Sequence, residues 1–363
     1  MLHAIPTIRT LALCICLSLP SLAAFSQIPY QETDIPVRDG KTLKADLYIG
    51  GGIDRKPVIL VQTPYNRLVY RVSLGRKGSN FPLDTSAYHY VFVDWRGFYG
   101  SAAAAVPGYD RGLDGYDIVE WLAAQPWCNG KIGTYGGSAL GMIQFQTARH
   151  KPPHLVCAAP AIIDYRTEYS DYYCQGVLRY EHVQSLERLG FTSSALITSR
   201  PAENAVWDLI RNQSDYPEEI AVPLLMCSGW FDHYPADVLR AFADLRTRSD
   251  ARVRSQHKLL MGPWTHSEVD LETQGDLRFP EAVDVFRDAA LQFFAYHLLG
   301  AKNGWPLQPA LRYFQMGENS WETADGWDAR PAIPYTLHLH SDGSPGRADG
   351  IGCRDAHHVL RSP

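Results

Sequence analysis

The sequence predicts an α/β protein with a mostly parallel sheet, and two patterns support that fold class. The first is a set of short, almost wholly apolar runs, such as PVILV at residues 57–61 and YVFVD at residues 90–94. Continuous apolar runs indicate strands that are covered on both faces. The second is the alternation of these runs with helix-like stretches, which favours parallel strands joined by right-handed crossovers. A chain of 363 residues is long enough for one large domain or two.

The individual elements follow from the period of the hydrophobic pattern. The expected strands are residues 42–49, 57–63, 90–94, a short run starting at 131, 154–159, 222–228 and 258–261. The expected helices are residues 111–124, 139–149, 236–246 and 281–299, the last ended by Gly300.

The alternation fails in two places. Residues 165–217 are rich in Tyr and charge and hold helix-like stretches, so we expect an insertion that forms a helical cap over the pocket. Residues 311–316 and 335–340 alternate like antiparallel strands, so we expect a β-type domain to begin near residue 309.

The first 26 residues have the layout of a secretory signal. Arg9 precedes an apolar run at residues 11–19, and small residues lead to a plausible processing site at Ala24-Phe25-Ser26. An uncleaved anchor is the alternative, but the apolar run is short for a membrane span. We therefore expect a secreted or periplasmic protein with no membrane attachment after cleavage.

The charge and the motifs of the sequence limit which partners and cofactors are expected. The net charge is −5 and no basic run stands out, so no nucleic-acid partner is expected. No H-E-x-x-H motif or phosphate-binding glycine loop is present, and the pair His338 and His340 lacks a third ligand, so neither a metal nor an organic cofactor is expected. The cysteines beyond residue 26 do not resemble a disulfide framework, although one disulfide involving Cys128 or Cys174 stays open.

The stretch KIGTYGGSALGMIQFQTAR at residues 131–149 predicts a strand, a sharp turn at Ser138 and an amphipathic helix. This is the design of a nucleophile elbow, in which small neighbours let the backbone bend and the helix N-terminus lies under the hydroxyl. The strict pattern is G-x-S-x-G, and here Leu140 occupies the last position while the glycine follows at Gly141.

Two further strands end in groups that could activate this serine. A serine hydroxyl needs a histidine to accept its proton and a carboxylate to orient that histidine. The strand PLLMCSG leads to Asp232, and the strand KLLMG leads to His266. Ser138, Asp232 and His266 thus have the residue types, the chain order and the strand-end placement of an α/β-hydrolase triad.

Other candidates are given structural roles. Asp237 and Asp244 are expected to be solvated on the following helix, and His233 to point away from the site. Asp94 also ends a strand, but we expect it to form an ion pair with Arg96.

Five motifs in order, TPYNR, VDWRGFYGS with DGYDIVEWLAAQPWCNGKIG, GGSALGMIQFQTA, GWFDHY and GPWTHS, resemble the cocaine esterase and X-Pro dipeptidyl-peptidase family. α-Amino acid ester hydrolases and glutaryl-cephalosporin acylases belong to the same group. The resemblance covers roughly residues 30–343. It implies that Ser138 is the nucleophile, Asp232 the orienting acid and His266 the general base. It also implies an oxyanion hole made by the Ala139 N–H and the Tyr65 phenol.

The same resemblance implies an α/β-hydrolase fold with a helical cap, followed by a jelly-roll domain. We expect a signal peptide at residues 1–26, a hydrolase domain at 27–308 with its cap at about 165–217, and a truncated β domain at 309–363. The family pattern stops within that domain, and residues 347–363 no longer resemble it. Because a jelly roll needs about eight strands, the remnant is expected to fold poorly.

Besides its incomplete β domain, the sequence departs from the family at residues that would recognise the substrate. The amino-ester hydrolases hold a substrate ammonium with a cluster of carboxylates. Asp171 matches one of these positions, but the two others fall on Tyr234 and Pro235. An ammonium clamp is therefore not expected, and Asp171 is expected on the cap surface.

The sequence as a whole predicts a secreted serine hydrolase that cleaves a small ester, an amide or a short X-Pro peptide. The choice among these substrates and the oligomeric state stay open. Two alternatives are a non-catalytic truncated fragment whose site is not assembled, and a carbohydrate-binding secreted module.

Overall fold

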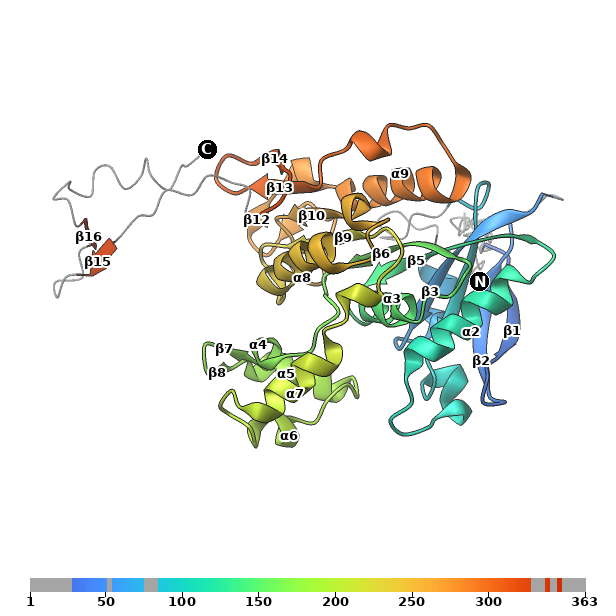
Figure 1. Cartoon of the computed structure of the whole chain (residues 1–363), viewed down its shortest axis with the longest axis horizontal. Coiled ribbons are helices and arrows are strands. Elements are labelled where there is room, and N and C mark those ends of the chain that lie inside the picture. The colour runs from blue at the N-terminus through green and yellow to red at the C-terminus, as the bar shows by residue number, and fades with distance from the viewer. Residues whose placement is uncertain (1–27, 51–53, 75–83, 328–336, 340–344, 348–363) are drawn as a thin grey trace, which may run out of the picture.

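The computed structural model describes residues 28–50, 54–74, 84–327, 337–339 and 345–347 (Figure 1). The expected signal peptide and residues 348–363 lie outside these ranges. Within them, no helix has the length and apolar character that crossing a membrane requires.

The centre of the molecule is a ten-stranded sheet with the order β1-β2-β4-β3-β5-β6-β9-β10-β13-β14. All neighbouring pairs from β4 to β13 are parallel, and only the outer pairs β1–β2, β2–β4 and β13–β14 are antiparallel. The predicted α/β class with a mostly parallel sheet is confirmed. The strands are β1 (Gln31–Pro36), β2 (Thr42–Tyr48), β3 (Lys56–Thr63), β4 (His89–Asp94), β5 (Cys128–Gly137), β6 (Leu155–Ala161), β9 (Leu225–Gly229), β10 (Lys258–Gly262), β13 (Leu311–Gln315) and β14 (Ser320–Ala324).

Helices cover both faces of this sheet (Figure 1). Alternate residues of β3 face opposite cores: Val58 packs in one buried cluster, and Ile59 packs in the other. The first cluster includes residues of α2 (Arg111–Ala123), α3 (Ala139–Arg149) and α8 (Pro235–Arg248), and the second includes residues of α9 (Val285–Leu299). Burial on both faces explains why the strands are continuous apolar runs.

The insertion between β6 and β9 lies apart from the sheet, at the lower edge of Figure 1. It has a small core of its own, formed by Tyr173, Val183, Ile197 and Trp207. Its elements are α4 (Tyr169–Tyr172), β7 (Tyr173–Cys174), β8 (Val177–Leu178), α5 (Tyr180–Arg188), α6 (Ser194–Thr198) and α7 (Ala205–Ser214). These elements are called the cap below.

The first strands of the segment expected to open a β domain extend the main sheet. Leu311 of β13 pairs in parallel with Leu259 of β10, and β14 then pairs antiparallel with β13. A separate hairpin follows from β15 (Leu337–Leu339) and β16 (Pro345–Arg347). The domain boundary at residue 309 and the jelly-roll assignment stay predictions.

The remaining short elements are α1 (Tyr70–Ser73), which follows the loop after β3, and the hairpin of β11 (Thr273–Gln274) and β12 (Leu277–Arg278). Four cysteines of the described chain are free thiols: Cys128, Cys157 and Cys227 are buried, and Cys174 is exposed. Cys353, the other cysteine beyond residue 26, lies outside the described residues.

Candidate active site

Ser138 occupies a strained turn between β5 and α3. Its backbone has φ 56° and ψ −126°, a conformation that non-glycine residues rarely adopt and that costs about 1–3 kcal/mol. The turn is held by the Ser138 N–H, which donates to the Ala161 carbonyl at 2.9 Å, while the Ser138 carbonyl accepts from the Gly141 N–H at 2.8 Å. Such strain is expected where the fold must present one side chain at the end of a strand.

Two glycines explain the departure from G-x-S-x-G. At Gly136, φ is 138° and an added Cβ would lie 2.6 Å from the Leu140 Cβ. At Gly141, an added Cβ would lie 2.6 Å from the Ile163 Cγ2. The second glycine is therefore placed where α3 passes closest to the segment after β6, and position 140 is free to carry leucine.

His266 lies between the other two expected triad residues. Its Nε2 is 2.9 Å from the Ser138 Oγ, and its Nδ1 is 2.6 Å from the Asp232 Oδ1. The Asp232 side chain is fully buried, and its Oδ1 also accepts the His233 N–H at 2.6 Å. When Nδ1–H donates to Asp232, Nε2 is left to accept the serine proton.

Tyr65 and Ala139 flank the serine from two different elements. Ala139 is the first residue of α3, so its N–H has no partner within the helix. Burial raises the pKa of the half-buried Tyr65 phenol, while its contacts with the Ser138 side chain and the Ala139 N–H lower that pKa in part. The phenol therefore stays protonated at neutral pH and is able to donate a hydrogen bond next to Ser138.

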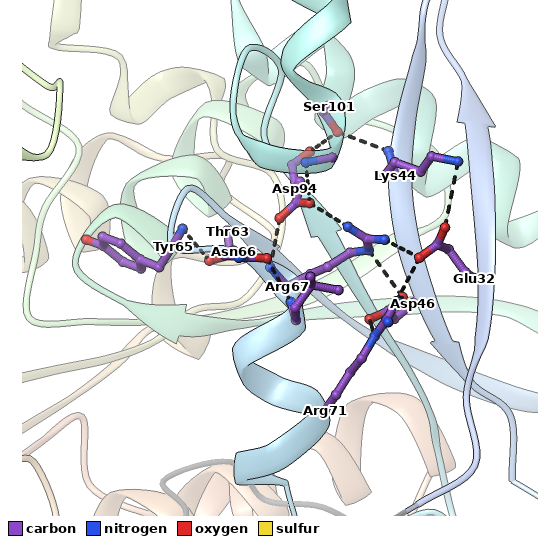
Figure 2. Close-up of polar contacts among 12 residues, drawn as sticks. Glu32, Lys44, Asp46, Thr63, Tyr65, Asn66, Arg67, Arg71, Asp94 and Ser101 are labelled. Carbon is purple, nitrogen blue, oxygen red and sulfur yellow. Dashed lines mark hydrogen bonds and ion pairs between the residues drawn. The ribbon is translucent and has the colours of Figure 1, made fainter.

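The loop that carries Tyr65 is anchored by a buried ion-pair network (Figure 2). The Tyr65 N–H donates to the Thr63 Oγ1 at 2.9 Å, and the Arg67 N–H donates to the Asp94 Oδ1 at 2.8 Å. The Arg67 guanidinium pairs with both Asp46 and Asp94, and both carboxylates are fully buried. The backbone N–H groups of Tyr65 and Arg67 are thus both held by hydrogen bonds to buried side chains, which fixes the loop around Tyr65.

This network corrects the expected partner of Asp94. Its ion pair is with Arg67, whereas Arg96 pairs with Asp39 and Asp114. The structural role given to Asp94 agrees with this network, but its closeness to Arg96 in sequence did not identify the partner.

Two cavities meet at His266, and Ser138 lines the larger of them. One has a volume of about 410 Å³ and is lined mainly by apolar and aromatic groups, among them Tyr70, Tyr135 and Phe286. The other has a volume of about 770 Å³ and lies between Ser138 and the cap. Tyr65, Gly137, Ile162, His266 and Ser267 line both cavities.

Two histidines that were not assigned to the site line the larger cavity. The His233 ring lies 5.2 Å from the His266 ring and 4.4 Å from the His182 ring, so the expectation that His233 points away is wrong. Burial lowers the pKa of His182 to about 4 and also lowers that of His233, so both are neutral at pH 7. In the sequence, only the position of His233 directly after Asp232 indicated that His233 could lie at the site.

Two acids that were expected to be exposed, Asp171 on α4 of the cap and Asp237 on α8, are buried. Asp171 is 7% exposed, and it accepts the Glu168 N–H at 2.8 Å. Asp237 is 5% exposed and pairs with Arg240. Burial raises the pKa of Asp171 well above its usual range. Asp244 is partly exposed and pairs with Arg166.

Within the described ranges, no group of three His, Cys, Asp or Glu side chains is arranged to hold a metal ion. The His338 and His340 side chains lie outside the description.

The family model that matches the chain is the X-Pro dipeptidyl-peptidase (S15 family), over residues 39–211 and 194–268. The cocaine esterase of Rhodococcus sp. (strain MB1 Bresler) is 27% identical over 88% of this chain and 63% of its own length. The chain thus spans less than two thirds of that relative.

Solved structures share the fold at lower identity. An α-amino acid ester hydrolase superposes with a TM-score of 0.72 and 23% identity, over 91% of this chain and 65% of its own. An aminopeptidase from a marine sediment archaeon, Thaumarchaeota archaeon, superposes with a TM-score of 0.71 and 22% identity, over 89% and 63%. These neighbours confirm the expected α/β-hydrolase core.

Proposed function

The chain belongs to the X-Pro dipeptidyl-peptidase (S15) family, and from this premise we propose that it is a serine hydrolase acting on an ester or amide bond. The observation that carries the proposal is the continuous hydrogen-bonded line from the Asp232 carboxylate through the His266 ring to the Ser138 hydroxyl. The three residues come from separate loops that follow β5, β9 and β10. A histidine with a purely structural role would not need a hydrogen-bond partner that is held on a strained turn, as Ser138 is.

In the proposed reaction, the Ser138 Oγ attacks the substrate carbonyl carbon while His266 Nε2 takes the hydroxyl proton. The carbonyl oxygen becomes an oxyanion, which accepts hydrogen bonds from the Tyr65 phenol and the Ala139 N–H. His266 then gives its proton to the leaving oxygen or nitrogen, the bond to that atom breaks, and an acyl ester on Ser138 remains.

Deacylation repeats these steps with water. His266 takes a proton from a water molecule, the resulting hydroxide attacks the acyl carbon, and Ser138 Oγ leaves with the proton that His266 returns. Asp232 stays ionised throughout and stabilises the imidazolium that forms in both halves of the reaction.

The proposed substrates are small-molecule esters, amides or short peptides. This range follows from the family and from two cavities of about 410 and 770 Å³ that meet at His266, the larger of which is lined by Ser138. A drug-sized ligand fits a pocket of this size.

The Ser138→Ala variant tests the proposal with 4-nitrophenyl butyrate as substrate. Removal of the nucleophile is expected to lower kcat by at least about 10³-fold. Ser193→Ala, which removes an exposed hydroxyl between α5 and α6 that lines neither cavity, is the matched control and should keep the wild-type rate. Full hydrolysis by Ser138→Ala would contradict the proposed role of Ser138.

We also propose that the hydrolase is exported, because residues 1–26 combine Arg9, an apolar run and a small-residue processing site. Expression of the full chain in a bacterial host, followed by N-terminal sequencing of the protein recovered outside the cytoplasm, tests this. A mature chain that starts near residue 27 is expected, and a chain retained in the cytoplasm with Met1 would contradict it.

A further inference from the structure

Arg111 is a cation without a counter-charge in the larger cavity. It is the first residue of α2 and lines this cavity together with Ser138. Its guanidinium lies 5.3 Å from the Trp95 ring and 5.4 Å from the Phe98 ring, two aromatic residues of the same cavity. Its Nε is buried and has no hydrogen-bond partner, and no ion pair joins the side chain to any residue that the structure describes.

The acids closest to Arg111 in sequence are already bound elsewhere. Asp110 accepts the Gly112 N–H at 2.8 Å and pairs with His150. Asp114 accepts two hydrogen bonds from the Arg96 guanidinium, at 2.8 and 2.7 Å. Burial lowers the pKa of Arg111, and Asp114 offsets this only in part. A half-buried guanidinium that is left without a carboxylate is costly, because it has lost water and gained no ion pair.

The other charged groups of the cavity do not supply that carboxylate. Arg166 is balanced by Asp215 and Asp244. The one acid that lines the cavity, Asp171, is engaged with the Glu168 N–H, and its burial favours the neutral form. The described lining of the cavity therefore carries an excess positive charge at Arg111.

The residues that line the larger cavity also argue against a substrate that carries an ammonium group. An ammonium needs carboxylates that point into the cavity. The cavity residue beside His182 is Tyr234, which brings no carboxylate: its phenol is 2.9 Å from the His182 Nε2. The sign of the charge in the cavity thus favours an anionic ligand.

We propose that Arg111 binds a carboxylate carried by the substrate, so that the hydrolase prefers esters or amides whose part in the larger cavity ends in a carboxylate. A guanidinium matches a carboxylate with two parallel hydrogen bonds, and the Trp95 and Phe98 rings hold it in place. This inference rests on the proposed function for the identity of the reaction, but the anion site itself is independent of catalysis.

Matched ester pairs test the preference on both sides of the scissile bond. In the acyl pair, the 4-nitrophenyl monoester of glutaric acid is compared with 4-nitrophenyl glutaramate, whose terminal amide is neutral. In the leaving-group pair, 4-carboxyphenyl butyrate is compared with 4-carbamoylphenyl butyrate. Spontaneous hydrolysis, which intramolecular attack speeds in the first ester, is subtracted with the Ser138→Ala protein.

In at least one pair, the wild-type kcat/KM is expected to be about 10- to 100-fold higher for the acid than for the amide, the range for a hydrogen bond between charged groups. Arg111→Met keeps the apolar stem but removes the charge, and the acid-to-amide ratio should fall by the same factor. Arg188→Gln is the matched control, since Arg188 is an exposed cap arginine that does not line the cavity. It should keep the wild-type ratio.

A binding measurement separates this inference from the proposed function. Calorimetric titration with glutarate is carried out on Ser138→Ala and on Ser138→Ala/Arg111→Met. Glutarate that binds the first protein at least about tenfold more tightly supports the anion site even if Ser138 proves inactive. If Arg111→Met does not fold, Arg111→Lys replaces it and should retain part of the affinity, because it keeps the charge and loses the fork. Equal acid and amide rates in the wild type, together with equal glutarate binding with and without Arg111, would overturn the inference.

Discussion

Tyr65→Phe isolates the contribution of one oxyanion donor. The substitution removes a single oxygen and keeps the ring, which packs edge-on against Phe191 with 6.2 Å between centroids. The loop on either side stays fixed, because its anchors are the Thr63 hydroxyl and the Arg67–Asp94 ion pair (Figure 2). The variant is therefore expected to fold like the wild type, and any loss of rate reports the missing donor.

The expected loss of kcat follows from the number of hydrogen-bond donors to the oxyanion. The proposed oxyanion site has two, the Tyr65 phenol and the Ala139 N–H, and both are at least half buried. Loss of one such donor typically costs 10²- to 10³-fold in kcat, about 2.7–4 kcal/mol of transition-state stabilisation. KM for a neutral ester should change by less than about threefold, because the ground-state carbonyl is a weaker acceptor than the oxyanion.

Steady-state kinetics with 4-nitrophenyl butyrate measure this effect, and Tyr180→Phe, a highly exposed cap tyrosine, serves as control. Because burial raises the pKa of Tyr65, the wild-type rate should show no decline from loss of this donor up to a pH of about 10, the usual value for tyrosine. A kcat within about threefold of wild type for Tyr65→Phe would refute the assignment of this phenol.

Three further substitutions test the framework of the site. Arg67→Met leaves the fully buried Asp94 carboxylate without a cation, while Asp46 keeps its ion pair with Arg71, and should lower the free energy of unfolding by about 3–5 kcal/mol, measured by urea denaturation. Gly141→Ala should destabilise by about 1–3 kcal/mol although alanine is the better helix former, because its Cβ would lie 2.6 Å from the Ile163 Cγ2; a stabilised variant would contradict this close packing. Burial raises the pKa of Asp164 to about 8, above the unfolded value of about 3.9, so the folded state binds the extra proton and stability is lost as the pH rises between these values. Asp164→Asn should thus gain stability relative to wild type by about 1–3 kcal/mol between pH 5.5 and 8, and a constant difference between the two urea midpoints would show that Asp164 is ionised in the folded protein.

The sheet was predictable because its signal is local. Runs such as residues 57–61 and 90–93 are apolar at every position, and the structure buries these strands on both faces. Ser138, Asp232 and His266 could be proposed for the same reason, since each lies within four residues of the end of a recognisable strand and the ends of parallel strands meet at one edge.

The features that were missed depend on contacts between distant segments. Asp94 is paired with a residue 27 positions away, and nothing in the sequence favours that arginine over the nearer Arg96. Asp171 and Asp237 are buried where the α4 region of the cap contacts α8, and a helical period cannot indicate such a contact. Residues 311–315 pair antiparallel with β14, as their alternating pattern predicted, but their parallel pairing with β10 joins distant segments and has no signal in that pattern.

The measurement that tests the central claim most directly is labelling of the purified protein with a fluorophosphonate, with the adduct mapped by mass spectrometry. Such a reagent phosphonylates a serine only when a base accepts its proton and the oxyanion hole receives the new P–O⁻ group, so it tests Ser138, His266 and Tyr65 together. A single adduct on Ser138, absent from the His266→Ala protein, is the predicted result. A folded protein that acquires no adduct, or acquires it on another serine, would contradict the assignment of this site.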